Sequence, residues 1–235
     1  MSADAGTGGA PFEDAAGEVV ETQVGLEEQA RSGGLARAQI RRVIAPSAQL
    51  VGADLGGARI EGGELPGAAL ATARFEATEV DGANLRGADA AGSLWRRARV
   101  RHSDLTEASF DGAEIVGCEL GPVAMARARL RGAAIRSTRF HAAELYGADF
   151  ARAVVLRSLF CDYEGGVASL GRARFDGATL VEVDLKGINL YRASFAGALL
   201  VRCDLRGAAL GSVDFEGARL VQCLTEGADT EGARL

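Results

Sequence analysis

The chain contains few of the residues on which many folds and active sites depend. Of its 235 residues only Lys186 is a lysine, four are proline, two are histidine and 6% are aromatic. No stretch approaches the roughly 18 apolar residues of a membrane-spanning helix, and the start lacks the basic and apolar regions of a signal peptide. We therefore expect a cytoplasmic protein that contacts no membrane.

Small residues are abundant instead, and they recur with a period of five. Between Leu50 and Leu235, almost every position divisible by five holds Leu, Ile, Val, Phe, Met or Trp, and the exceptions are Ala90, Gly165, Thr225 and Thr230. The residue two positions earlier is Ala, Gly, Ser, Thr, Cys or Val, except at Tyr163 and Ile188. The phase of this repeat never changes, so the segment is one repeat array.

The spacing has a direct structural meaning. Large and small apolar residues two positions apart point to the same side of an extended chain. The residues between one large position and the next small one then face solvent and include the corners, where glycine is frequent. Four five-residue units close a square coil, and successive coils stack at about 4.8 Å. The pattern predicts an all-β quadrilateral β-helix of about nine coils.

Several units resemble the A(D/N)LXX repeat of the pentapeptide-repeat family. They are Ala53-Asp54-Leu55, Ala83-Asn84-Leu85-Arg86-Gly87, Ala148-Asp149-Phe150 and Ala218-Arg219-Leu220. The resemblance implies a right-handed solenoid over residues 35–235. Counting by 20 then predicts an inward column rich in aromatic residues. Its members are Leu55, Phe75, Trp95, Ile115, Ile135, Val155, Phe175, Phe195, Phe215 and Leu235.

The open end of a solenoid exposes unpaired strand edges and needs a cap. Residues 1–34 form an N-terminal tail and capping segment in this interpretation. Residues 12–30 have early acidic residues and no proline, so they could form a capping helix, and a disordered acidic tail over residues 1–17 is the alternative.

Three places depart from the repeat. Pro46 lies where the repeats become regular, Gly121-Pro122 places a proline in a turn, and residues 161–169 combine a bulky residue at a small site with a glycine at a large one. Each could be a bulge or a small loop, and because the phase is kept, any insertion must be a multiple of five. Family members that protect topoisomerases use protruding loops, so residues 161–169 are the loop candidate. Its central residues are Asp162, Tyr163, Gly165 and Gly166.

No constellation for catalysis, cofactor binding or metal binding is evident. His102 and His141 are both predicted to face outward, without an acidic partner at a spacing that builds a triad. Cys203 and Cys223 should stack on successive coils, but two thiols alone do not complete a zinc site, and core packing is the preferred interpretation. We expect a protein that is not an enzyme and needs no cofactor.

Counting by 20 places most of the outward carboxylates of one face in a single row. This predicted acidic row contains no base, and it consists of Glu64, Asp104, Glu144, Glu164, Asp184 and Asp204. Ordered carboxylates could present to a protein a field like that of DNA phosphates. A merely solvated surface is the alternative, because Arg86, Arg127, Lys186 and Arg206 lie nearby. Another face alternates in sign from Arg59 to Arg139, as in a solvated salt-bridge ladder.

A second outward feature is apolar, and most of it lies toward the C-terminal end. Its residues are Leu159, Val181, Leu199, Val201 and Val221. A contiguous exposed apolar patch is typical of an interface, so this patch predicts a homodimer.

The family resemblance and the acidic row together imply a function. Pentapeptide-repeat proteins that resemble duplex DNA bind type II topoisomerases and confer antibiotic resistance or self-immunity. We therefore predict a DNA-mimic-like protein that binds DNA gyrase or topoisomerase IV and protects it from a poison, without binding nucleic acid itself. A structural or adaptor solenoid with another protein partner is the alternative.

Overall fold

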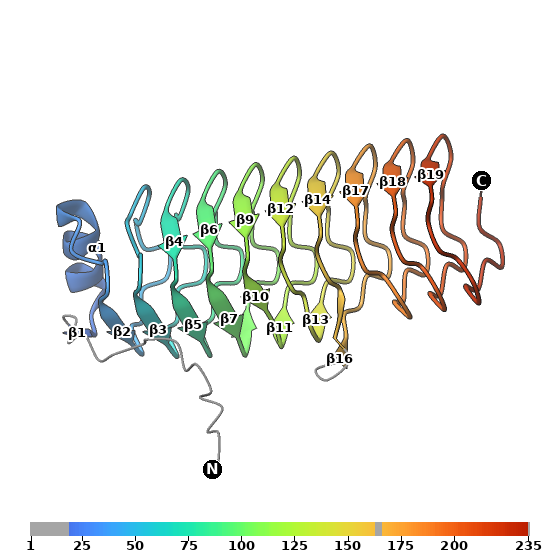
Figure 1. Cartoon of the computed structure of the whole chain (residues 1–235). Coiled ribbons are helices and arrows are strands. Elements are labelled where there is room, and N and C mark those ends of the chain that lie inside the picture. The colour runs from blue at the N-terminus through green and yellow to red at the C-terminus, as the bar shows by residue number, and fades with distance from the viewer. Residues whose placement is uncertain (1–18, 163–165, 235) are drawn as a thin grey trace, which may run out of the picture.

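The structure, a computed structural model, describes residues 19–162 and 166–234. The described chain is nearly all-β, and it forms a β-solenoid of about ten turns with one short helix. Figure 1 shows the coils stacked side by side along a rod, with the helix α1 at one end. The solenoid prediction is confirmed, with about one coil more than the sequence count.

Short parallel strands on two sides of the square account for most of the named elements. The first side holds β1 (Val19–Val20), β2 (Gln39–Arg41), β3 (Arg59–Glu61), β5 (Glu79–Asp81), β7 (Arg99–Arg101) and β10 (Glu119–Leu120), hydrogen-bonded in that order. The fourth side holds β4 (Arg74–Glu76), β6 (Leu94–Arg96), β9 (Glu114–Val116), β12 (Ala134–Arg136), β14 (Val154–Leu156), β17 (Thr179–Val181), β18 (Leu199–Val201) and β19 (Arg219–Val221).

The second side contains β8 (Ser103–Asp104), β11 (Val123–Ala124) and β13 (Ala143–Glu144), and isolated parallel bridges extend it in both directions. The third side consists of such bridges alone, beginning with Gln49 and Ala69. Each bridge joins a residue to its counterpart one coil later. For example, Leu50 donates its N–H to the carbonyl of Ala69, and Ala69 donates to the carbonyl of Ala48, at 2.8 and 2.9 Å.

The corners explain the five-residue period. At many corners the large inward residue accepts a hydrogen bond from the N–H three residues later, as Leu50 does from Ala53 at 3.1 Å. The second residue after each large position is usually left-handed, with φ near +60°, which favours glycine. The corner at Pro46 follows the same geometry, because Ala48 donates its N–H to the carbonyl of Ala45 at 3.2 Å. From Leu35 to Phe215 the large and small positions of the described coils are buried and form one continuous core, whereas Leu220 of the last coils is 40% exposed.

The irregular corner at Gly121-Pro122 stays within the stack. Its peptide bond is cis, and Gly121 has a φ of 146°. A Cβ on Gly121 would lie 1.7 Å from the carbonyl oxygen of His141, so only glycine fits there. The coils on either side keep their register, so no loop is inserted at this corner.

The helix α1 (Gln23–Ser32) covers one end of the rod (Figure 1). Thr22 caps its N-terminus by accepting from the N–H of Gly25, and the left-handed Gly33 ends it. Leu26 is fully buried against the core. Glu27 accepts a hydrogen bond from the N–H of Gln49 at 3.2 Å, so the helix also satisfies an amide of the first coil. Residues 1–18 lie outside the described residues.

On either side of residues 163–165 the chain departs from the coil and forms two short strands, which we call the hairpin. The strands β15 (Cys161–Asp162) and β16 (Gly166–Val167) pair with each other in antiparallel fashion (Figure 1). Phe160 accepts its corner hydrogen bond from Ala168, eight residues later instead of three. One extra five-residue unit is therefore inserted at this corner. Because of this insertion, a residue before the hairpin pairs with the residue five units later in the chain instead of four, as Val155 does with Leu180.

This shift overturns the predicted aromatic column. The column that begins at Leu55 and Phe75 continues through Val155 to Leu180, Leu200 and Leu220. Phe175 stacks instead on Phe150, with ring centroids 4.8 Å apart. Phe195 and Phe215 follow in the same stack, at 4.7 and 5.3 Å from their neighbours, and Leu235 lies outside the described residues. Counting by 20 failed here because an insertion of one repeat length leaves the five-residue phase unchanged.

Candidate functional site

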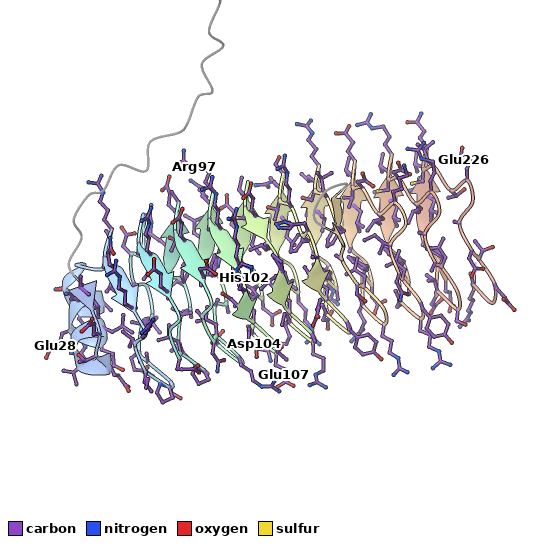
Figure 2. The ribbon with its side chains drawn as sticks, turned by 90° about the horizontal axis from the view of Figure 1, so that it is seen from below. Glu28, Arg97, His102, Asp104, Glu107 and Glu226 are labelled. Atoms are coloured by element: carbon purple, nitrogen blue, oxygen red, sulfur yellow. The ribbon has the colours of Figure 1, made fainter. Side chains whose placement is uncertain are left out.

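The second face of the rod is the nearest match to the predicted acidic row. Its outward positions, connected by bridges from coil to coil, are Ile44, Glu64, Asn84, Asp104, Ala124, Glu144, Ser169, Asn189, Ala209 and Asp229. We call these residues the second-face row. Four of them are acidic and none is a base. Figure 2 views the molecule from below and places Asp104 between His102 and Glu107.

Two members of the predicted acidic row lie elsewhere. Asp184 and Asp204 pair in register with Leu159, so they belong to the first face. The hairpin is the cause, because its extra unit moves every later unit to the neighbouring face. Glu164 lies outside the described residues. The second-face row therefore keeps Glu64, Asp104 and Glu144 and gains Asp229.

The carboxylates of the second-face row are not neutralised by arginine. Glu64 accepts a hydrogen bond from the side-chain amide of Asn84 at 2.7 Å, and Asp104 accepts from the backbone N–H of Thr106 at 2.8 Å. In the described part of the chain, Glu64, Asp104 and Glu144 have no arginine or lysine nitrogen within the 4.0 Å of an ion pair.

Three of the four bases that the sequence places near the row, Arg86, Arg127 and Arg206, are paired with carboxylates outside it. Arg86 and Arg127 both bind Glu107, at 3.5 and 2.6 Å, on the corner between the second and third faces. Arg206 binds Asp204 on the first face, and this hydrogen bond holds the pKa of Asp204 below its usual value. The second-face row thus remains acidic from Glu64 to Glu144.

The first face carries the predicted ladder of alternating charge. Glu79 lies 3.0 Å from Arg59 and 3.5 Å from Arg99, and Glu119 lies 3.5 Å from Arg99 and 3.8 Å from Arg139. The ladder prediction is confirmed. All these side chains are about one-third or more exposed, so the ladder is a solvated surface of modest energetic value.

The hairpin occupies the predicted loop segment, at the corner between the first and second faces. Asp162 lies in β15 and Gly166 in β16. Tyr163 and Gly165 lie outside the described residues. Since the hairpin follows the column of Phe140 and Phe160 and precedes Ser169 of the second-face row, it leaves the rod beside that row.

The predicted apolar patch is divided by the same register shift. Val181, Leu199, Val201 and Val221 lie on neighbouring strands β17, β18 and β19. Leu159 is bridged to Arg139 and Asp184 and lies on the first face, so it does not belong to this surface. Val154, which is 38% exposed, and Leu156 extend the surface instead, because β14 pairs with β17. We call the resulting set the apolar strip.

Two thiols and one histidine can be described in detail. Burial raises the pKa of Cys118 and of Cys203 to about 11, so both thiols stay protonated at neutral pH. His102 lies 2.9 Å from Asp81, and both side chains are exposed. Across residues 19–162 and 166–234, no three metal-binding side chains cluster, and no helix has the length and apolarity to cross a bilayer.

These features define a parallel β-solenoid whose distinct surfaces are its outward rows and corners. The family model for pentapeptide repeats matches residues 48–87, 83–121, 168–207 and 188–224, in eight copies. These segments cover more than half of the chain, and the chain belongs to the pentapeptide-repeat family. The stretch between the matches, residues 122–167, begins at Pro122 and contains the hairpin. Proteins of this family are generally structural or binding proteins that mediate protein interactions.

Solved structures of similar chains come from several sources. HetL, a pentapeptide repeat protein involved in heterocyst differentiation regulation in Nostoc sp. strain PCC 7120, is 22% identical over 90% of this chain and 94% of its own, with a TM-score of 0.34. QnrB1, a plasmid-mediated fluoroquinolone resistance protein, is 19% identical over 89% and 88%, with a TM-score of 0.38. Rfr23 from Cyanothece 51142 is 22% identical over 49% and 90%, with a TM-score of 0.32. No curated protein matches the chain.

Proposed function

We propose that this protein binds DNA gyrase or a related type II topoisomerase through the second-face row and protects it from a poison. The observation that carries the proposal is a row of ten outward positions that contains four carboxylates and no base. The protein would act in the cytoplasm, where its partner binds DNA, and the interaction involves no covalent chemistry.

The geometry of the row supports this function in a specific way. Glu64, Asp104 and Glu144 are separated by two coils each, which corresponds to about 9.6 Å. Hydrogen bonds from neighbouring groups orient Glu64 and Asp104, so the charges are held in place on a rigid scaffold. A basic channel built for DNA phosphates would be attracted to such a line of fixed negative charge.

The experiment is a gyrase supercoiling assay with purified protein, with and without a fluoroquinolone or an albicidin-like poison. Wild-type protein should restore supercoiling in the presence of the poison. The double variant Asp104→Asn/Glu144→Gln should need roughly fivefold to tenfold more protein, since each exposed charge pair contributes up to about 1 kcal/mol. The loss should shrink as salt is added.

The chain offers a matched control for this experiment. Asp184→Asn/Asp204→Asn removes the same number of carboxylates from the first face and should leave protection unchanged. Equal losses of protection in both double variants would show that protection depends on net charge and not on the second-face row. Absence of any effect of the wild-type protein on gyrase would refute the proposed function.

We further propose that the hairpin contributes to protection, because it leaves the rod beside the second-face row. Deletion of residues 161–165 joins Phe160 to Gly166 and leaves Gly-Val-Ala-Ser before Leu170, which is a regular repeat unit. If the hairpin reaches toward the cleavage site, this deletion variant should still bind gyrase but lose rescue from the poison. Full rescue by the variant would assign protection to the row alone.

The apolar strip favours a second function, that of an adaptor solenoid that forms a homodimer. Val154, Leu156, Val181, Leu199, Val201 and Val221 form a continuous surface on β14, β17, β18 and β19. Burial of such a surface stabilises association. Leu199→Glu/Val201→Glu should therefore yield a monomer in light scattering, whereas Leu159→Glu should not. A wild-type mass equal to that of one chain would exclude the dimer.

A further inference from the structure

The third face of the rod carries a concentration of positive charge in its middle coils. The segments concerned are residues 126–132, 146–152, 171–177 and 191–197, which are brought together by bridges such as that between Arg129 and Asp149. They contain seven arginines and two aspartates. Arg127 and Arg129 are paired with Glu107 and Asp111 of the preceding coil, at 2.6 and 3.3 Å, so the positive excess comes from the other five arginines. We call this surface the basic face. Its charged residues are Arg127, Arg129, Arg131, Asp149, Arg152, Arg172, Arg174, Asp176 and Arg192.

The two carboxylates of the basic face are less exposed than the arginines around them. The side chain of Asp149 is only 10% exposed, and it lies 2.7 Å from Arg131 and 3.6 Å from Arg174. Asp176 is 28% exposed and binds Arg174 at 2.8 Å. The side chains of Arg131 and Arg174 are more than half exposed. A partner therefore meets guanidinium groups before it meets carboxylates.

Three arginines of the basic face are exposed and have no carboxylate partner. Arg152, Arg172 and Arg192 have φ values between 57° and 59° and lie at corners that flank the third face. Within the described residues, no carboxylate oxygen lies within 4.0 Å of any of the three. Their charge is therefore available to an external anion.

Two exposed tyrosines complete the surface. Tyr146 is 48% and Tyr191 is 46% exposed, and each ring covers a buried glycine on the following coil. A Cβ on Gly171 would lie 3.4 Å from the ring of Tyr146, and one on Gly211 would lie 3.2 Å from the ring of Tyr191. The guanidinium carbons of Arg172 and Arg192 lie 5.8 and 5.1 Å from the two ring centroids. Rings held in this way lose little freedom on binding, and Tyr and Arg are enriched in binding hot spots.

The basic face ends sharply at both sides. Residues 106–112 on the preceding coil contain Glu107 and Asp111 and no base, and residues 211–217 on the following coil contain Asp214 and Glu216 and no base. The positive surface therefore spans four coils, or about 15 Å along the rod. A continuous polyanion such as duplex DNA would extend beyond it over these acidic coils and be repelled there.

We infer that the basic face binds a short acidic segment of a partner polypeptide. Carboxylates spread over about 15 Å of the partner would meet Arg152, Arg172 and Arg192, while the tyrosine hydroxyls donate hydrogen bonds and the rings supply apolar contact. This inference does not depend on topoisomerase binding, because it uses a different face of the rod.

The test is fluorescence anisotropy of a labelled decaglutamate peptide titrated with the full chain at low salt. Binding should be detectable and should weaken with added salt. The variant Arg172→Glu/Arg192→Glu should bind at least about tenfold more weakly, since two exposed attractions become repulsions. Tyr146→Ala/Tyr191→Ala should weaken binding to a smaller extent.

Arg37→Glu/Arg42→Glu is the matched control. Both of its arginines also have positive φ and no carboxylate within 4.0 Å among the described residues, and the change in net charge is the same. It should bind decaglutamate within about twofold of wild type. Equal weakening in this control, or no binding by the wild-type chain, would overturn the inference. Tighter binding of a 20-base-pair DNA duplex, lost in Arg172→Glu/Arg192→Glu, would also overturn it and assign the face to nucleic acid.

Discussion

The coils before the hairpin and those after it use the same repeat but present different surfaces. Before Phe160, each unit pairs with the unit four places later in the chain, as Ile135 does with Val155. After Ala168 the same four-unit spacing returns, as in Leu180 with Leu200, but each unit has moved by one side of the square. The five-residue phase therefore determines whether a side chain is buried, whereas the number of preceding units determines the face on which it lies.

The largest effect on stability is expected in the aromatic stack that joins residues from before and after the hairpin. Phe175 is fully buried between Phe150 and Phe195. Phe175→Ala should lower the free energy of unfolding by about 3–5 kcal/mol, because it removes a large core side chain and leaves a cavity. Urea denaturation measures the loss, and Phe175→Leu should cost clearly less. A loss below about 1 kcal/mol would contradict the burial of this ring.

A smaller effect distinguishes the two registers directly. In the structure Phe175 stacks on Phe150, whereas counting by 20 places it beside Val155. A double-mutant cycle of Phe150→Leu and Phe175→Leu should show a coupling energy of about 0.5–1.5 kcal/mol, as stacked aromatic pairs do. The corresponding cycle of Val155→Ala and Phe175→Leu should show less. A larger coupling energy between Val155 and Phe175 than between Phe150 and Phe175 would support the register that counting by 20 predicts.

The smallest effect is expected from removal of the hairpin itself. Deletion of residues 161–165 leaves a regular repeat unit, so the free energy of unfolding should change by less than about 1 kcal/mol. Thermal melting followed by circular dichroism measures this. A large loss of stability would mean that the hairpin holds the two parts of the rod together.

The sequence predicts the fold well because burial depends on local phase alone. Leu50, Phe75 and Ala98 could be assigned to the core from their positions in the repeat, and all three are buried. The faces could be assigned only up to the hairpin, because a five-residue insertion does not disturb the phase. Glu64 and Glu144 were therefore placed on one face with correct register, whereas Asp184 and Asp204 were not.

The basic face was missed for the same physical reason. Arg127, Arg129 and Arg131 occupy every second position of one segment, and Arg172 and Arg174 do the same in another. Counting by 20 places these two segments on different sides of the rod, so it does not predict that their arginines share one surface. The departure at Tyr163 and Gly165 was the only signal that could have corrected the count.

The left-handed corners have a consequence for the heat resistance of the protein. Nineteen of the described residues other than glycine have positive φ, and Thr72, with a φ of 59°, is β-branched. L-residues other than glycine are strained in this conformation, by roughly 1 kcal/mol or more. Thr72→Gly should therefore raise the melting temperature by a few degrees. The rod could be made more thermostable one corner at a time, while its core, its second-face row and its apolar strip remain unchanged.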